Sequence, residues 1–361
     1  MESRKIQRVG AATFTVSLPR EWVLRRNLRR GDELFIVEEG EGLRLLPSPM
    51  ADHGERDIAE FAIDADLCEE PGMLERVIVG NYVLGRERIL IESATRIRSE
   101  HQNEIRHAVR RLMGIGIMEE TANRVRLQCS LNPSNYPLDA LVKRLYNLGF
   151  TMLTESVEAL LTGDAALAED ALKREDDADM MYWLILRLVL SAQLDEGLIE
   201  KLGMRTRLEI PQYRVISRDL EAVADHAHDV ARHVKEILDA DLKVPKPVLK
   251  SLESLSTAIG LVYSRALGGL LSRDLKQANE AIRLSKAIEG REEDLVRLVL
   301  KETNEVKTVV LLRTISSSMA QIAEYARSIA VIAYNRYLEK ATNLCKPAAP
   351  KALAIPVRAE P

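Results

Sequence analysis

Two acidic pairs near the middle of the chain have a spacing that suits cation ligands. Glu175 and Asp179 are four residues apart, and so are Glu221 and Asp225. On a helix, residues at this spacing share one face, where like charges repel. A cation between two such helices would explain both pairs, because hard and borderline cations prefer carboxylate oxygens. The alternative is a solvated helix face, since 29% of the residues are charged.

Composition limits the kind of protein that contains these pairs. The 361 residues suffice for several domains, and an aromatic content of 4% is typical of helical bundles. The formal net charge of −4 does not by itself indicate a nucleic-acid partner. The cysteines have no metal-ligand spacing, the N-terminus lacks the apolar core of a signal peptide, and the apolar run at 180–190 is too short to span a bilayer. We therefore expect a cytoplasmic protein with no integral membrane segment.

The first 46 residues are expected to be rich in β-strand and basic. Residues 5–9 and 13–18 alternate apolar and polar side chains, and residues 33–37 and 43–46 predict a second strand pair. So small a sheet is not stable alone, which predicts a partner chain. Residues 1–30 hold eight basic and two acidic side chains. This excess suits salt-dependent contacts with DNA phosphates, and the alternative is a solubilising rim.

Three stretches of this segment resemble the AbrB/SpoVT swapped-hairpin family. They are Arg4-Lys5-Ile6-Gln7, Thr15-Val16-Ser17-Leu18-Pro19-Arg20-Glu21-Trp22 and Leu28-Arg29-Arg30-Gly31-Asp32-Glu33-Leu34. The resemblance implies that residues 1–49 form an intertwined homodimer that presents basic residues to DNA. Asn27 stands where the family often has Gly, and Asn tolerates a positive φ. The residues expected to bind DNA are Arg4, Lys5, Arg8, Arg25 and Arg26.

A small α/β domain of ferredoxin-like type is expected over residues 55–131, after a linker rich in proline and glycine. The pattern predicts strand, helix, strand, helix and hairpin, at 58–63, 71–84, 88–91, 99–112, 116–120 and 124–128. This domain has neither a phosphate-binding glycine loop nor a catalytic cluster. Its sequence indicates no function.

From residue 138 to residue 338 the chain is expected to be helical and to contain an internal repeat. Ala159-Leu160-Leu161-Thr162-Gly163-Asp164 matches Gly269-Leu270-Leu271-Ser272-Arg273-Asp274 at an offset of 110 residues. Three helices are predicted in each repeat, at 138–162, 165–193 and 206–239 in repeat one (136–240) and at 246–272, 275–301 and 304–338 in repeat two (246–340). Residues 341–361 are expected to be a flexible tail.

The same alignment places the acidic pairs in register. Glu175 and Asp179 align with Ser285 and Glu289, and Glu221 and Asp225 align with Ala320 and Glu324. Repeat two therefore keeps only Glu289 and Glu324, which predicts a weaker or absent second metal site. Arg187, Arg218 and Arg313 are expected to neutralise acidic groups. His226 and His228 lie on different helix faces, so one of them could support Asp225; the alternative is a solvated or helix-capping role.

The two three-helix repeats resemble the PhoU family over roughly 200 residues. The acidic pair on the second helix and Leu220-Glu221-Ala222-Val223-Ala224-Asp225-His226-Ala227 on the third carry the resemblance. It implies a metal site on each repeat, and a role in repressing phosphate uptake with a phosphate ABC transporter and a sensor kinase as partners. With its N-terminal hairpin and α/β segment, the chain is similar to the archaeal branch of phosphate uptake regulators.

The expectation is thus a multidomain α+β protein: a swapped-hairpin β domain, a small α/β domain and an all-α bundle. We expect a negative regulator of phosphate uptake that binds DNA through its N-terminal dimer. Its helical repeats would bind a divalent or trivalent metal ion (Mg, Mn, Zn or Fe). The alternatives are an adaptor that docks on a phosphate ABC transporter or signalling partner without binding DNA, and a metal-dependent phosphohydrolase. No nucleophile–base arrangement is present, so we do not expect an enzyme.

Overall fold

The computed structural model describes residues 3–10, 13–39, 42–47 and 59–347. The chain divides into two compact units, Met1–Ala59 and Glu60–Pro361. Most of the predicted linker and of the predicted flexible tail lies outside the described residues. Each unit is described by itself.

The N-terminal unit contains two separate hairpins and no buried side chain among its described residues. Strand β1 (Gln7–Val9) pairs antiparallel with β2 (Thr13–Thr15), and β3 (Leu34–Glu39) pairs antiparallel with β4 (Gly42–Pro47). Pro19 precedes helix α1 (Arg20–Arg25). Asn27 has a φ of 51°, so the position does require a residue that tolerates the left-handed region. Exposed apolar side chains in this unit are Ile6, Val9, Phe14, Val16, Leu24, Phe35, Ile36 and Leu43.

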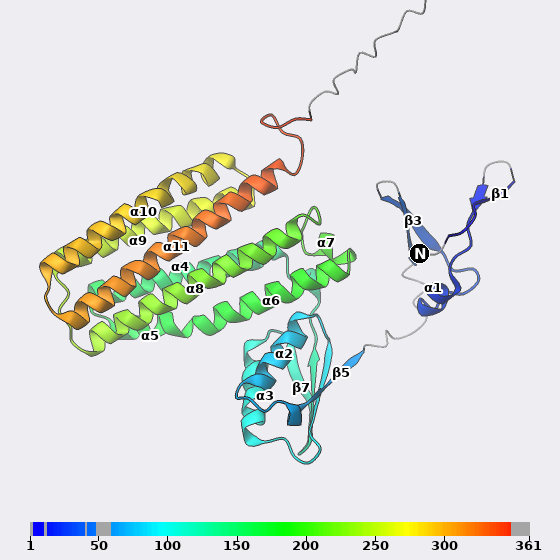
Figure 1. Ribbon diagram of the computed structural model, residues 1–361, viewed down its shortest axis with the longest axis horizontal. Coiled ribbons are helices and arrows are strands. Elements are labelled where there is room, and N and C mark those ends of the chain that lie inside the picture. The colour runs from blue at the N-terminus through cyan, green and yellow to red at the C-terminus, as the bar shows by residue number, and fades with distance from the viewer. Residues whose placement is uncertain (1–2, 11–12, 40–41, 48–58, 348–361) are drawn as a thin grey trace, which may run out of the picture. The chain divides into compact units, whose positions relative to one another are not determined.

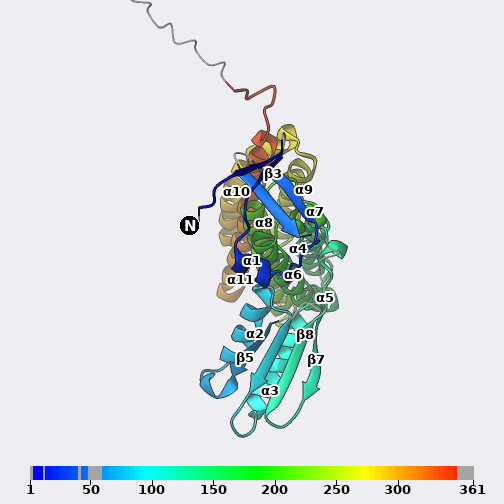
Figure 2. The same cartoon turned by 90° about the vertical axis from the view of Figure 1, so that its right-hand side faces the viewer.

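The second unit begins with a four-stranded sheet that has both of its helices on one face (Figure 2). The strand order is β5-β6-β8-β7, with β5 and β6 parallel and the other neighbours antiparallel. The elements are β5 (Glu60–Asp64), α2 (Met73–Val83), β6 (Arg88–Glu92), α3 (Ser99–Arg111), β7 (Ile115–Glu120) and β8 (Arg124–Cys129). The predicted order of strand, helix, strand, helix and hairpin is confirmed, but the ferredoxin-like type is wrong. The chain runs β-α-β-α-β-β and places its two parallel strands side by side, whereas a ferredoxin-like domain runs β-α-β-β-α-β.

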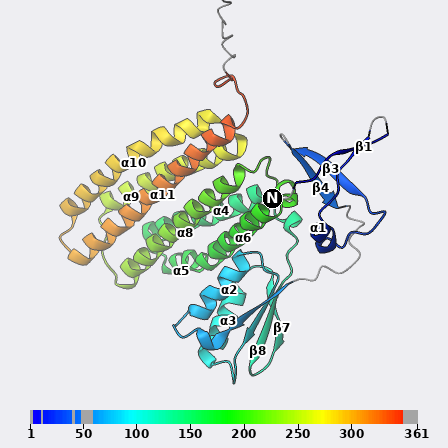
Figure 3. The same ribbon diagram turned by 45° about the vertical axis from the view of Figure 1, so that its right-hand side comes forward.

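The rest of the unit is a helical bundle (Figures 1 and 3). Its helices are α4 (Leu138–Thr162), α5 (Ala165–Lys173), α6 (Glu175–Leu194), α7 (Gly197–Lys201), α8 (Glu209–Asp239), α9 (Lys246–Ser272), α10 (Leu275–Glu302) and α11 (Val306–Leu338). The predicted helices match these bounds closely, with one exception. The predicted second helix of repeat one is broken at Arg174, which ends α5 and precedes α6.

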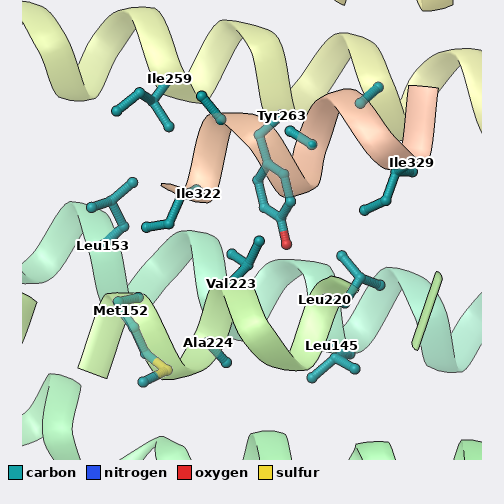
Figure 4. Close-up of a cluster of buried hydrophobic side chains, with 14 of the residues drawn as sticks. Leu145, Met152, Leu153, Leu220, Val223, Ala224, Ile259, Tyr263, Ile322 and Ile329 are labelled. Atoms are coloured by element: carbon teal, nitrogen blue, oxygen red, sulfur yellow. The ribbon is translucent and has the colours of Figure 1, made fainter. Parts of the chain in front are cut away.

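The first and third helices of both repeats share one apolar core (Figure 4). Leu145 and Met152 of α4 and Val223 of α8 meet Tyr263 of α9 and Ile322 of α11. The ring of Tyr263 also stacks on that of Tyr146, with centroids 4.1 Å apart. Because this core spans both repeats, each repeat is stabilised by burying its apolar face against the other.

The loops after α4 and α9 are built alike. Asp164 accepts hydrogen bonds from the backbone at the start of α5, and Asp274 does the same for α10. The residue before each cap is left-handed: Gly163 has a φ of 74° and Arg273 a φ of 53°. The side chain of Arg273 forms an ion pair with the buried carboxylate of Glu209.

Among the described residues, no helix combines the length and apolarity needed to cross a membrane.

Candidate metal centre

Three of the four predicted metal ligands converge between α6 and α8. One carboxylate oxygen each from Asp179, Glu221 and Asp225 lies within 4.8 Å of the other two. Asp179 is on α6, and the other two are one turn apart on α8, which packs against α6. Over the described parts of the chain, three or more acidic, histidine or cysteine side chains come this close together at no other place. The donor set is entirely oxygen, which fits a hard cation.

Glu175 lies outside this cluster. The guanidinium of Arg174 donates hydrogen bonds of 2.8 and 2.7 Å to Glu155, at the point where α5 ends and α6 begins. Glu175 is consequently the first residue of α6, where the positive end of the helix dipole favours a carboxylate. Its Oε2 lies 2.8 Å from Nδ1 of His228. Glu175 thus has a partner of its own, while burial and the nearby charges of Asp179 and Asp225 raise its pKa.

Two arginines neutralise part of the cluster's charge. Arg218 of α8 pairs with Glu221, as expected from the sequence. Arg111, at the end of α3, donates to Asp179 and also lies 3.2 Å from Glu75 of α2.

Asp225 pairs with no arginine among the described residues. Burial raises the pKa of Asp225 above its ordinary value, and the negative charge of Asp179 raises it further. A bound cation would offset both effects.

His226 faces the neighbouring repeat rather than the carboxylates. Its ring stacks on Tyr325 of α11, with centroids 5.8 Å apart. Burial lowers the pKa of His226, so its imidazole is neutral near pH 7. A neutral ring packed on an aromatic side chain contributes to the core between the repeats.

Arg187 has a different role from the one expected. This buried side chain donates hydrogen bonds to three backbone carbonyls at the C-terminal end of α2. The acceptors are Tyr82, Gly85 at 3.1 Å and Arg86 at 3.1 Å. The expectation that Arg187 neutralises an acidic group is therefore wrong. It caps a helix of the α/β domain, whose last carbonyls have no partner within the helix.

The contact between Arg111 and Asp179 was not predicted. The two residues are 68 positions apart, and the α/β domain shows no sequence motif that points to the helices. In Figures 1 and 3, α2 and α3 lie beside α6, which brings the end of α3 to the cluster. One sequence feature could have indicated a contact between α6 and the α/β domain. It is the charged Arg187, which interrupts an otherwise apolar run and therefore needs a polar partner when it is buried.

The corresponding region of repeat two is an open polar cavity of about 240 Å³ between α10 and α11. Glu289 is exposed there, and Glu324 already accepts two hydrogen bonds from Arg327, at 2.6 and 2.9 Å. Arg313 pairs with Glu292 at 2.7 Å, as a neutralising role predicted. Ser285 and Ala320 line the cavity where repeat one has carboxylates. Repeat two thus offers two predicted ligands instead of three.

The predicted DNA-binding residues all lie on the N-terminal unit and are exposed. Arg8 is on β1, Arg25 is the last residue of α1, and Arg26 follows it. Arg4 and Lys5 precede β1. Exposed basic side chains of this kind suit contact with a phosphate backbone.

Residues 142–234 match the PhoU domain family. They run from α4 into α8 and include the three converging carboxylates. This part of the chain therefore resembles the PhoU domain.

Two proteins with similarity to this region come from bacteria. The "Phosphate-specific transport system accessory protein PhoU homolog 2" of Thermotoga maritima is 22% identical over 187 residues, which cover 49% of this chain and 74% of that protein. The crystal structure of PhoU from Pseudomonas aeruginosa aligns with a TM-score of 0.45 and 18% identity, over 54% of this chain and 93% of that one.

Proposed function

We propose that this protein is a PhoU-like negative regulator of phosphate uptake and phosphate homeostasis. The observation that carries the proposal is the PhoU match over residues 142–234, the region where the carboxylates converge. Similarity to a protein named as an accessory of a phosphate-specific transport system points to the same process. A phosphate ABC transporter is accordingly the partner to test first.

The metal site of this regulator would use Asp179, Glu221 and Asp225. Three carboxylates without sulfur or nitrogen ligands favour Mg, Mn or ferric iron over Zn. A bound ion would supply positive charge that holds α6 and α8 together and screens their acidic side chains from one another. Glu289 and Glu324 would form at most a weaker second site, because one of them is already paired with Arg327.

Metal content can be measured against a matched control. Elemental analysis and calorimetric titration with Mg²⁺ and Mn²⁺ would compare the wild type with Asp225→Asn and Asp229→Asn. Asp229 lies one turn further along α8 and pairs with Arg232 at 2.7 Å, outside the cluster. We expect Asp225→Asn to lose binding and Asp229→Asn to keep it. Equal metal content in all three proteins would rule out the site.

The N-terminal unit is proposed to form the homodimer. A two-stranded hairpin is marginally stable in water, and none of the described side chains of this unit is buried. A second copy that covers Phe14, Phe35 and Ile36 would supply the missing core. Sedimentation of the full chain is expected to give a dimer, and the Phe35→Asp variant a monomer. A wild-type monomer at micromolar concentration would contradict this assignment.

In that dimer, Arg4, Lys5, Arg8, Arg25 and Arg26 from both chains would contact DNA phosphates. Gel shifts with promoter fragments of phosphate-uptake genes should weaken steeply as salt is raised, and the Arg25→Ala/Arg26→Ala double variant should bind less at every salt concentration. If the wild type bound no such fragment at low salt, the adaptor alternative would be favoured. The protein would then act by docking on the transporter or a signalling partner.

The regulatory role itself is tested in cells. Deleting the gene in its native host should raise uptake of radiolabelled phosphate when phosphate is plentiful, because repression is lost. Expression of the wild type should restore low uptake, and Asp229→Asn should do the same. Unchanged uptake after deletion would contradict the proposal.

A further inference from the structure

One face of α6 is the docking surface for the α/β domain. The residues on this face recur every four positions: Asp179, Trp183, Arg187 and Ser191. Asp179 pairs with Arg111, Trp183 packs against the apolar cores of both the α/β domain and the bundle, and Arg187 caps α2. At the far end, a Cβ added to Gly85 would lie 2.9 Å from Oγ of Ser191, so the backbone of Gly85 packs closely against the Ser191 side chain.

Asp179 belongs to this docking face and to the carboxylate cluster at the same time. The same carboxylate group converges with Glu221 and Asp225 and pairs with the guanidinium of Arg111. Arg111 in turn lies 3.2 Å from Glu75, which also lies 2.8 Å from His107. Glu75 therefore keeps a partner if Arg111 moves, whereas Asp179 would need another cation.

We propose that Arg111 is an internal cation that competes with metal for Asp179, so that the α/β domain responds to metal occupancy of the PhoU domain. The inference rests on the metal site of the proposed function. A guanidinium and a metal ion at one carboxylate repel each other at short range, so binding of one weakens binding of the other. Arg187 keeps its three carbonyl partners in either state, so the domain stays attached while contacts at the Asp179 end change.

The competition is measured by titrating the full chain with Mg²⁺. Arg111→Gln removes the competing charge and should tighten Mg²⁺ binding roughly three- to tenfold, the effect expected for loss of one partly exposed ion pair. The matched control is Arg110→Gln, since Arg110 is exposed, adjacent on α3 and equal in charge. It should leave the affinity within about twofold of the wild type.

A second readout follows the docking face directly. The chain has two tryptophans, so the Trp22→Phe variant leaves Trp183 as the sole one. Mg²⁺ should shift the emission of Trp183 and raise amide exchange at the end of α3. In the Arg111→Gln background the Mg²⁺-induced change at α3 should be lost, because the contact is already broken.

The outcomes separate the two proposals. If the wild type binds Mg²⁺ and Arg111→Gln binds it no more tightly, the competition is refuted and the metal site stands. If neither protein binds Mg²⁺ or Mn²⁺, both proposals fail. Binding by Arg111→Gln alone would support the competition in its strongest form, with the arginine blocking the site outright.

Discussion

The two repeats have the same three-helix construction but present different outer faces on their second helices. At the offset of 110 residues, Trp183 and Arg187 of α6 correspond to Glu293 and Arg297 of α10. Arg187 is buried beneath the α/β domain, whereas the Arg297 side chain is 72% exposed and pairs with Glu293 and Asp294 of its own helix. An arginine at the same position of the repeat is therefore buried in repeat one and exposed in repeat two. The difference arises because the α/β domain packs on α6.

The acidic side chains also differ between the two repeats. Repeat one, which carries the α/β domain, brings together three carboxylates, while repeat two has Ser285 and Ala320 at two of the aligned acidic positions. The two repeats thus share their core and caps but not their polar site. Substitutions at matched positions can test how far the two repeats differ.

The largest difference is expected between Arg187→Ala and Arg297→Ala. Losing Arg187 removes its donors from the carbonyls of Gly85 and Arg86 and one of the donors to Tyr82, and should destabilise the unit by about 3 kcal/mol. Losing Arg297 removes only exposed ion pairs and should cost less than about 0.5 kcal/mol. Urea unfolding followed by Trp183 fluorescence in the Trp22→Phe background measures both. Equal costs would show that Arg187 does not anchor the domain.

A smaller difference is expected at the left-handed positions that precede the capping aspartates. Gly163→Ala should cost about 1 kcal/mol, because an L side chain disfavours this conformation. Arg273→Gly relieves the same strain in repeat two but leaves the buried carboxylate of Glu209 without its arginine. We expect a net loss of about 2 kcal/mol, measured by the same denaturation. A stabilised Arg273→Gly protein would mean that the ion pair contributes little.

The smallest effect concerns pH. The folded-state pKa of Asp225 is raised above its ordinary value of 3.8, so its ionisation opposes folding. That penalty is absent below the unfolded pKa, grows as pH rises from the unfolded to the folded pKa, and is constant above the folded pKa. In EDTA, Asp225→Asn should therefore melt at a higher temperature than the wild type near pH 7, and the gap should narrow as pH falls towards about 4. Glu324→Gln, which removes one exposed ion pair in repeat two, should change stability by less than about 0.5 kcal/mol. If Asp225→Asn melted at a lower temperature than the wild type in EDTA, the ionised Asp225 side chain would stabilise the metal-free fold rather than oppose it.

Local features of this fold were predictable from the sequence, whereas contacts between domains were not. Apolar periodicity and the repeated motifs that end at Asp164 and Asp274 predicted helix bounds to within a few residues, because both signals are local in the sequence. The break at Arg174 was missed because α5 and α6 continue one helical pattern. Four-residue spacing correctly grouped Glu221 with Asp225, but it could not indicate that Arg111 reaches Asp179 from a separate domain.

The most direct measurement is anomalous diffraction from crystals of the full chain soaked in Mn²⁺. The account predicts a strong anomalous peak among the carboxylates of Asp179, Glu221 and Asp225, with Arg111 turned away from Asp179, and a weak peak or none beside Glu289 and Glu324. Absence of a peak at the three carboxylates, with Arg111 still paired to Asp179, would contradict it.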